Sequence, residues 1–313
     1  MEGLNPYHLQ VASFILINVI LGVSIYVTLS TGQLSLGNAG FMSIGAYTAA
    51  LLATRCDLPI PLGIVLGSLL AGAAGVLVGI PSLRLSGVYL AIATLGFGEV
   101  IRAVAINWES LTGGAVGIAA IPQMGRVLLS MARELGFPPD RLGMRPNQVV
   151  SLLVFLILLA VTALVVAFFL RLGRTRVGRA YEAIRLDERA AAAAGIPVTY
   201  YKVLAFSQGA MISGLAGALF AHSTSFISPG DFTYHRAVEI LVFAVFGGSG
   251  HILGPVFGAA FLTLLPEALR AISHYRHILY GLLLVLIMIY RPQGVVDKPL
   301  LRRFRRIRPA EAP

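Results

Sequence analysis

The sequence predicts an all-α, polytopic membrane protein with about eight to ten transmembrane helices. Of its 313 residues, 57% are hydrophobic and only 12% are charged, whereas roughly a quarter of the residues in soluble domains are charged. Apolar runs of about 20 residues recur along the chain, and each is long enough to cross a bilayer as a helix. A transmembrane β-barrel would alternate apolar and polar residues, but the run at 151–170 is continuous.

The apolar runs predict nine spans within a single transmembrane domain that covers residues 1–313. We expect the first span to be retained, because no basic segment precedes it and no convincing small-residue cleavage site follows it. The spans lie at 9–30, 34–53, 60–80, 86–106, 148–170, 203–224, 237–250, 253–271 and 277–290.

Glycines and polar residues break two of these spans, near 32–40 and near 247–255. Irregular backbone inside a bilayer is stable only where protein or water satisfies its N–H and C=O groups. Broken helices in the two halves of a membrane transport protein indicate a substrate path. The alternative is that both stretches are loops at the membrane surface.

The distribution of basic residues predicts the orientation of the chain, whose net charge is +10. Segments 171–202 and 291–308 each hold seven basic residues, whereas 107–147 holds four arginines against three acidic residues. Because cytoplasmic loops are enriched in Lys and Arg, we expect 171–202 and the basic tail at 291–313 in the cytoplasm and 107–147 as a periplasmic loop. The amino terminus is then outside and the carboxyl terminus cytoplasmic. Positive charges that flank apolar spans indicate a lipid bilayer as partner and argue against nucleic acid.

Small residues recur at four-residue spacing in two spans, which places them along one face of each helix. We interpret both stripes as packing seams, because small residues let helix backbones approach closely inside a membrane. The stripes are Gly63, Gly67, Ala71, Gly75 and Gly79, and Ala205, Gly209, Ser213, Gly217 and Ala221.

Ionisable residues inside spans are candidates for function. Glu99 and Arg102 are three residues apart in an apolar span, so they share a helix face and can pair; Arg102 could also reach the outer interface with Glu99 neutralising it. Together with Glu239 they keep open the alternative of an ion-coupled secondary transporter. Neither the single cysteine, Cys56, nor the six histidines indicate a metal site, and no catalytic site is indicated.

Segment 178–196 is predicted to form its own helix inside the basic loop, because Ala, Arg and Glu favour helices and Gly195 with Pro197 is a stop signal. Such a helix, charged on one side and alanine-rich on the other, can lie in a groove of another protein; the simpler alternative is a solvated loop helix. The segment resembles the coupling loop of ABC-importer permeases, whose Glu-x-Ala-Ala-x3-Gly-Ile element docks into the ATP-binding subunit. The resemblance assigns ATPase coupling to Gly178, Arg179, Arg185, Glu188, Ala190, Ala191, Gly195 and Ile196.

Further motifs extend the resemblance over about 30–294. The spacing from Glu188 to Gly195 is one residue longer than in the general coupling element, but it suits the branched-chain amino-acid branch. Together the motifs resemble the LivM-type permeases of branched-chain amino-acid ABC importers, within the LivH/LivM/ribose-permease-like family. They are Gly32–Gly37, Phe41 with Gly45–Tyr47, Leu83–Phe97, Leu111–Gly114, Gly247–Gly250, Leu265–Glu267 and Arg291–Gly294.

The resemblance implies a permease subunit that moves leucine, isoleucine or valine across the inner (plasma) membrane of a bacterium or archaeon. Neither lysine lies in a Gly-x4-Gly-Lys-Ser/Thr loop, so we expect ATP and Mg on partner subunits and neither an ATPase site nor a cofactor in this chain. The implied partners are a LivH-like second permease, two LivG/LivF-like ATP-binding subunits and a periplasmic amino-acid-binding protein. Permeases for urea or short amides, or for aromatic acids, are alternatives within the same class.

In such importers the binding protein supplies most of the substrate recognition, so the path through the permease can be lined by small polar groups. Glycine-rich breaks also expose N–H groups and helix ends that could receive a carboxylate. The residues expected along the path are Gln33, Ser35, Asn38, Thr94, Thr112 and Gly248.

Overall fold

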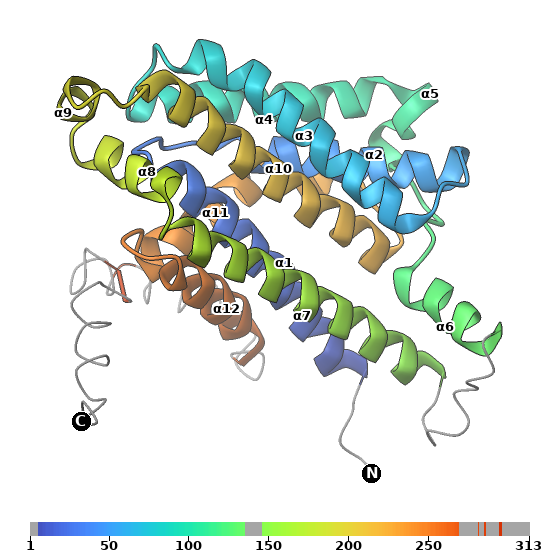
Figure 1. The fold of residues 1–313 in the computed structure, drawn as a ribbon. Helices are drawn as coiled ribbons and strands as arrows, with labels where there is room; N and C mark the ends of the chain where they lie inside the picture. The colour runs from blue at the N-terminus through green and yellow to red at the C-terminus, as the bar shows by residue number, and fades with distance from the viewer. Residues whose placement is uncertain (1–5, 135–145, 269–280, 282–284, 286–293, 296–313) are drawn as a thin grey trace, which may run out of the picture.

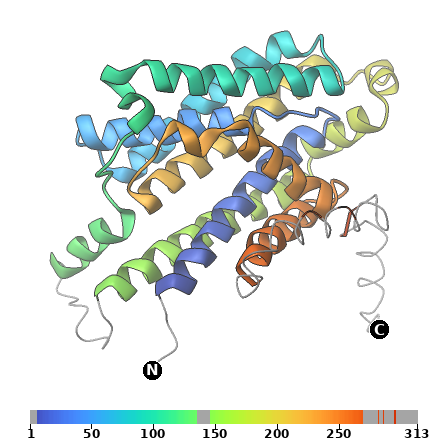
Figure 2. The ribbon, with the colours of Figure 1, turned by 180° about the vertical axis from the view of Figure 1, so that it is seen from behind.

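A computed structural model of the chain describes residues 6–134, 146–268, 281, 285, 294 and 295. These residues form a bundle of α-helices (Figures 1 and 2), in which the described extended segments pair only at an isolated antiparallel bridge between Ile118 and Ile227. The predicted all-α fold is confirmed. In chain order the elements are α1 (Pro6–Leu29), α2 (Asn38–Arg55), α3 (Ile60–Ser82), α4 (Val88–Asn107), α5 (Glu109–Thr112), η1 (Gly114–Val116), α6 (Met124–Glu134), α7 (Pro146–Leu172), α8 (Arg176–Leu186), α9 (Glu188–Ala193), α10 (Val198–Thr224), η3 (Pro229–Phe232), α11 (Tyr234–Gly247) and α12 (Leu253–Ala268).

Each of the first eight predicted spans corresponds to one helix. The ninth, at 277–290, and the basic tail at 291–313 lie outside the described residues apart from 281, 285, 294 and 295. Helices α1, α3, α4, α7 and α10 are long and apolar enough to cross a bilayer, whereas α2, α11 and α12, which flank the predicted breaks, have 18, 14 and 16 residues. The chain is a multi-pass helical membrane protein.

Helix α10 packs against α1, α2 and α3 in the middle of the bundle (Figure 1). The two predicted stripes of small residues form these contacts. A Cβ atom added to Gly67 of α3 would lie 2.7 Å from the carbonyl oxygen of Gly45 on α2, and one added to Gly217 of α10 would overlap the carbonyl oxygen of Met42. Backbones this close leave no room for a side chain, so the prediction of packing seams is confirmed.

The two ends of the bundle carry different elements (Figure 1). At one end, called the α8–α9 end, Arg185 of α8 donates a hydrogen bond to the carbonyl oxygen of Ser249, between α11 and α12. At the other, called the α5–α6 end, Arg55 at the end of α2 donates to the carbonyl oxygens of Ser110 and Leu111 in α5.

The first break, residues 30–37, separates α1 from α2. Asn38, the first residue of α2, donates hydrogen bonds to Oγ of Ser24 at 2.8 Å and to Oγ of Ser213 at 3.2 Å. Ser24 lies more than one turn inside α1, and Ser213 lies in the middle of α10. The break therefore runs back into the bundle, and α2 begins inside it. The predicted interruption near 32–40 is confirmed.

The second break, residues 248–252, makes α11 and α12 a tight helical hairpin. A Cβ atom added to Gly247 would overlap the carbonyl oxygen of Gly254, so the two backbones touch. Gly248 has φ +100°, a conformation that favours glycine, and Gly294 packs directly on its backbone. The predicted interruption near 247–255 is confirmed.

Candidate coupling site and substrate path

The basic loop at 171–202 folds as two short helices, α8 and α9, and not as the single helix predicted over 178–196. Asp187 separates them with an extended backbone, φ −156° and ψ 111°. Its carboxylate accepts hydrogen bonds from the N–H groups of Arg189 at 2.8 Å and Ala190 at 3.0 Å. The prediction of one continuous helix was wrong because an aspartate side chain competes for backbone N–H groups and favours the N-cap position.

Gly195 ends the helical loop in the way the sequence predicts. Its φ is +79°, in the left-handed region that glycine adopts without steric cost. The N–H of Ile196 donates back to the carbonyl oxygen of Ala191 at 3.1 Å, which closes the turn. A Cβ atom added to Gly195 would meet nothing within 4 Å. The backbone conformation, and not crowding, therefore favours glycine here.

Helix α9 exposes an apolar surface. Ala191 is buried against the bundle, whereas Ala190 and Ala192–Ala194 are exposed. Leu186 before α9 is 80% exposed, and Tyr200 after it is 61% exposed. Exposed apolar residues that gather in one place mark an interaction surface. We call this surface the α9 patch; it consists of Leu186, Ala190, Ala192, Ala193, Ala194 and Tyr200.

Glu188, at the start of α9, pairs within the chain. Its Oε2 lies 2.5 Å from Nζ of Lys202 on α10, and the Glu188 side chain is still 55% exposed. The ion pair joins α9 to α10 and leaves part of the carboxylate accessible beside the α9 patch.

Helix α8 is fixed to the bundle through Tyr181. The Tyr181 side chain is buried, and its hydroxyl donates a hydrogen bond to Oε1 of Gln208 on α10 at 3.0 Å. Burial, with a smaller effect of the neighbouring Tyr200 and Tyr201, raises the pKa of Tyr181 above its ordinary value. The hydroxyl therefore stays protonated and keeps donating.

Gly178 and Arg179 fix the start of α8 to the end of α7. A Cβ atom added to Gly178 would overlap the carbonyl oxygen of Leu172. Nη1 of Arg179 donates to the carbonyl oxygen of Arg174 at 3.2 Å. A displacement of α8 is therefore opposed at both its start and its buried face.

Arg185 connects α8 to both breaks. Its Nη1 donates to the carbonyl oxygen of Ser249 at 2.8 Å, and its Nη2 lies 3.4 Å from Oγ of the same residue. A Cβ atom added to Gly32 in the first break would lie 3.9 Å from Cα of Arg185. The two interruptions, far apart in sequence, thus meet at one residue of α8.

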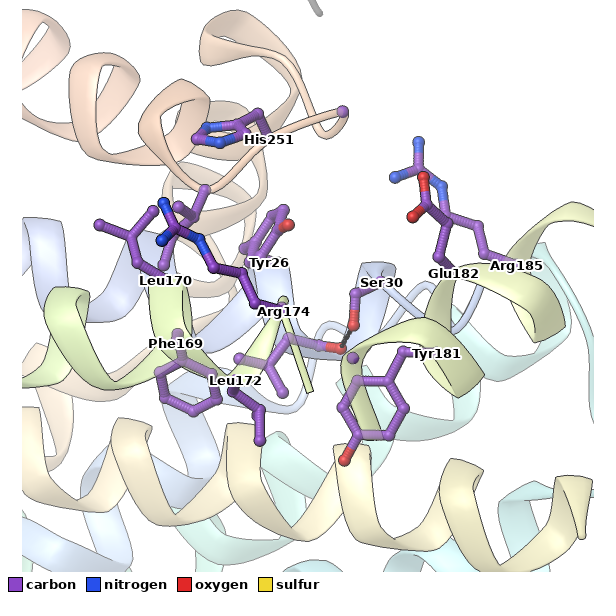
Figure 3. Close-up of a pocket in the computed structure, with 15 residues that line it drawn as sticks. Tyr26, Ser30, Phe169, Leu170, Leu172, Arg174, Tyr181, Glu182, Arg185 and His251 are labelled. Atoms are coloured by element: carbon purple, nitrogen blue, oxygen red, sulfur yellow. Dashed lines mark hydrogen bonds between the residues drawn. The ribbon is translucent and has the colours of Figure 1, made fainter. Parts of the chain in front are cut away.

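A cleft of about 240 Å³ lies at this meeting point. Figure 3 shows Arg174 and His251 on one side of it and Glu182 and Arg185 on the other, with Tyr26 of α1 between them. Residues of α1, α7, α8 and the α11–α12 turn line the cleft. Any movement of α8 relative to α1 and α7 would change its shape.

Four of the predicted path residues come together around the first break: Gln33, Ser35, Asn38 and Thr94 are all buried. Oγ1 of Thr94 accepts a hydrogen bond from the N–H of Leu36 at 2.9 Å, and Oγ of Ser35 accepts one from the N–H of Gly37 at 3.2 Å. These side chains satisfy the irregular backbone that the bilayer would otherwise leave without partners.

The other two predicted path residues lie elsewhere. Gly248 is in the second break, whereas Thr112 is in α5, where its hydroxyl donates to the carbonyl oxygens of Ala105 at 2.6 Å and Trp108 at 2.8 Å. Thr112 therefore closes the end of α4 and does not join the cluster around the first break.

The predicted pair of Glu99 and Arg102 forms, with Nε of Arg102 2.7 Å from Oε2 of Glu99. Oε1 of Glu99 also accepts a hydrogen bond from the N–H of Tyr234 at 3.1 Å. Tyr234 is the first residue of α11, so the carboxylate lies at the positive end of that helix dipole. Both charged side chains remain 34% exposed in the isolated chain.

A second polar network was not predicted. Nη2 of Arg236 donates to Oδ1 of Asn18 at 2.6 Å, and Nη1 pairs with Oε2 of Glu239 at 2.6 Å. Nδ2 of Asn18 donates in turn to Oγ1 of Thr263 on α12 at 2.8 Å. Asn18, an amide in the middle of the apolar first span, was the signal in the sequence that could have indicated it.

Comparison with known proteins matches residues 7–288 to the family described as "Branched-chain amino acid transport system / permease component". The chain is 38% identical over 297 residues to the high-affinity branched-chain amino acid transport system permease protein LivM of Escherichia coli (strain K12), which covers 92% of this chain and 69% of the relative. It is 25% identical to the probable branched-chain amino acid transport permease protein LivM of Methanocaldococcus jannaschii, over 77% of this chain and 69% of the relative. It is 28% identical to the corresponding LivH protein of Escherichia coli (strain K12), over 62% and 60%. No solved structure matches the chain.

Proposed function

The chain belongs to the family of permease components of branched-chain amino acid transport systems, and we propose that it is the membrane-spanning subunit of an ABC importer for leucine, isoleucine and valine. The observation that supports this most strongly is the α8–α9 loop. It combines the Glu-x-Ala-Ala-x3-Gly-Ile element with an exposed apolar surface and a hydrogen bond to the second break.

We propose that the α9 patch docks into a groove of an ATP-binding subunit. Alanine side chains are small, so a partner can approach the α9 backbone closely and bury the patch. The remaining exposed part of Glu188 and the exposed Arg189 can make polar contacts at the edge of such an interface, as is typical of interface rims.

Helix α8 then carries the movement of the ATP-binding subunit into the bundle. The contacts of Gly178, Tyr181 and Arg185 hold α8 against α7, α10 and the α11–α12 turn. Because packed helices switch between discrete arrangements and do not deform continuously, a shift of α8 displaces Arg185 and with it the backbone of both breaks. The cleft in Figure 3 is the part of the chain whose shape such a shift changes most directly.

The proposed assembly has a second, LivH-like permease, two LivG/LivF-like subunits that bind ATP and Mg, and a periplasmic amino-acid-binding protein. The similarity of the chain to relatives named both LivM and LivH supports the pairing of two related permeases. The excess of arginine at 171–202 favours a cytoplasmic α8–α9 end and an inner-membrane location, with the amino terminus outside.

The direct test is to purify the complex with its ATP-binding subunits and measure ATP hydrolysis after adding the binding protein loaded with single ligands. Stimulation by leucine, isoleucine or valine supports the proposal. Stimulation by urea, a short amide or an aromatic acid, without stimulation by these amino acids, would show that the stimulating compound is the substrate instead. Failure of the ATP-binding subunits to co-purify would contradict the ABC assignment itself.

A further inference from the structure

A second cavity, of about 260 Å³, lies away from the α8–α9 end and is partly open to the surface. It is smaller than the roughly 300–1,000 Å³ sites that bind drug-sized molecules, so it suits a ligand of the size of one amino acid. Its walls come from α1, α2, α10, η3 and α11. The lining residues are Phe14, Asn18, Met42, Phe220, Asp231 and Arg236.

From this lining we infer that the cavity is a binding site for a zwitterionic α-amino acid with an apolar side chain, a substrate subsite within the permease. The inference rests on the proposed function for the role of the ligand as substrate. The cavity combines one cationic side chain, one anionic side chain and an apolar wall, which are the three groups that such a ligand needs.

Arg236 is the partner for the ligand carboxylate. A guanidinium has five N–H donors, and the hydrogen bonds to Asn18 and Glu239 use two of them. Those bonds also fix the guanidinium in place, since Asn18 is held by Thr263. Because a carboxylate matches the planar donor edge of arginine, a fixed guanidinium favours this ligand group.

Asp231 is the partner for the ligand ammonium. Its Oδ2 accepts hydrogen bonds from the N–H and the hydroxyl of Ser228, at 2.8 and 3.1 Å. This capping box orients the carboxylate at the start of η3. Ionised carboxylates offer about four acceptor sites, so an ammonium group can add to the two bonds from Ser228.

The apolar wall accounts for a branched aliphatic side chain. The rings of Phe14 and Phe220 lie 6.2 Å apart, and Met42 is an adaptable apolar neighbour. The row of rings continues from Phe220 through Phe232 to Tyr47, with centroids 6.4 and 6.0 Å apart. The Tyr47 hydroxyl at the end of this row is buried and has no hydrogen-bond partner among the described residues. Tyr47 does not itself line the cavity, and Phe232 separates its ring from that of Phe220.

The position of the cavity also fits a site on the route of a substrate. Asn18 lies in the middle of α1 and accepts a hydrogen bond from Arg236, which places the Arg236 guanidinium beside the middle of that span. Asp231 lies in η3, between α10 and α11. Ionisable residues at membrane depth are rare and face the protein interior or a water-filled path. The cavity thus lies between the α5–α6 end and the breaks that meet at Arg185.

The test measures ligand binding to the two-permease complex with its ATP-binding subunits, in nanodiscs and without the binding protein. Tritiated leucine is displaced by leucine, by 4-methylpentanoate, which lacks the ammonium, and by 3-methylbutylamine, which lacks the carboxylate. Wild type is expected to bind leucine at least about tenfold more tightly than either analogue, since hydrogen bonds to charged groups are worth that much. This comparison of ligands uses only the wild-type complex, so it does not depend on whether a variant folds. Equal binding of all three ligands overturns the inference.

Two variants locate the contacts. Asp231→Asn is expected to weaken the binding of leucine by about tenfold or more. It should leave the binding of 4-methylpentanoate unchanged, because that ligand has no ammonium group to contact Asp231. Arg236→Gln is expected to weaken the binding of leucine and to leave the binding of 3-methylbutylamine unchanged, because that ligand has no carboxylate. Glu109→Gln is the control and should bind leucine like wild type, because Glu109 is exposed in α5 and does not line the cavity. Equal weakening of leucine and the analogue in each variant would show a structural defect and overturn the assignment.

The outcome for the cavity can be separated from that for the proposed function. If the reconstituted wild-type importer imports leucine but Asp231→Asn and Arg236→Gln bind leucine like wild type, the binding site assigned to the cavity is wrong and the proposed function stands. If the wild type neither imports nor binds any apolar amino acid, both the cavity and the proposed substrate are wrong.

Discussion

Nη1 of Arg185 lies 2.8 Å from the carbonyl oxygen of Ser249, which connects the helix before the coupling element to the break between α11 and α12. The acceptor is a backbone oxygen in a turn rich in glycine, so the hydrogen bond acts on the path of the chain itself. Charge-assisted hydrogen bonds are about twice as strong as neutral ones. The contact is therefore a direct mechanical link between the α8–α9 loop and a broken span.

The left-handed backbone at Gly195 predicts that substitutions there impair binding of the ATP-binding subunit to different degrees. Gly195→Val should weaken ATPase co-purification by about 5–30-fold, because a β-branched residue in this conformation costs roughly 1–2 kcal/mol. Gly195→Asn should have a much smaller effect, since asparagine tolerates positive φ. Pull-down of the ATP-binding subunit with each purified variant measures the difference. Equal binding by both variants and wild type would contradict a coupling role for this turn.

The same position also tests for contact with a partner. A Cβ atom at Gly195 meets nothing within 4 Å in the isolated chain, so Gly195→Trp adds bulk without a clash inside the chain. A loss of coupling larger than that of Gly195→Val indicates that a partner covers the site. The loop is only a solvated connector if Gly195→Trp changes neither co-purification nor transport.

The ion pair of Glu188 with Lys202 predicts rescue by charge reversal. Glu188→Lys alone should impair coupling slightly, because an exposed ion pair contributes at most about 1 kcal/mol. Adding Lys202→Glu restores the pair with reversed sign and should recover transport if the contact within the chain is what matters. Vesicle uptake of leucine compares the single and double variants. A double variant worse than the single one would show that the contact of Glu188 with the partner subunit matters more than its pair with Lys202.

The packing seam predicts that added methyl groups destabilise the chain at crowded glycines only. Gly67→Ala should lower the thermal unfolding midpoint of the detergent-solubilised complex, because overpacking costs about 1–3 kcal/mol and its Cβ would lie 2.7 Å from the carbonyl oxygen of Gly45. Gly96→Ala in α4 is the matched control, since nothing lies within 4 Å of its Cβ. If both variants unfold at the same temperature, the seam is not a close backbone contact.

Cysteine labelling tests the proposed orientation. In a Cys56→Ser background, Val116→Cys at the α5–α6 end should react with a membrane-impermeant maleimide added to intact cells, since Val116 is 78% exposed. Arg185→Cys at the α8–α9 end should react only after the membrane is permeabilised, because arginine-rich loops are retained in the cytoplasm. The opposite pattern would invert the topology.

Sequence alone predicts those features that depend on neighbouring residues. The first eight span positions follow from runs of apolar residues, and the left-handed turn at Gly195 follows from its place before Pro197. The seams follow from four-residue spacing. The split of the loop helix at Asp187 was also a local feature, because aspartate favours the N-cap position, but the high helix propensity of the alanines outweighed it in the prediction.

Contacts between distant parts of the chain could not be predicted in this way. Arg185 and Ser249 are 64 residues apart, and Arg236 and Asn18 are 218 apart. Periodicity places a side chain on a face of its helix but does not say which helix packs there. Thr112 shows the same limit. Its place in a Thr-Gly-Gly motif led to the prediction that it lines the substrate path, whereas its hydroxyl closes the end of α4.

The proposed coupling of ATP hydrolysis to amino-acid import through Arg185 of the α8–α9 loop is measured directly by the ratio of leucine imported to ATP hydrolysed. The reconstituted importer is compared for wild type, Arg185→Ala and Arg176→Ala, the last being an exposed arginine at the start of the same helix. Arg185→Ala should assemble and hydrolyse ATP but import several-fold less leucine for each ATP, because removing a charge-assisted hydrogen bond costs about 1.5–3 kcal/mol. Arg176→Ala should keep the wild-type ratio. A wild-type ratio in Arg185→Ala would contradict coupling through Arg185.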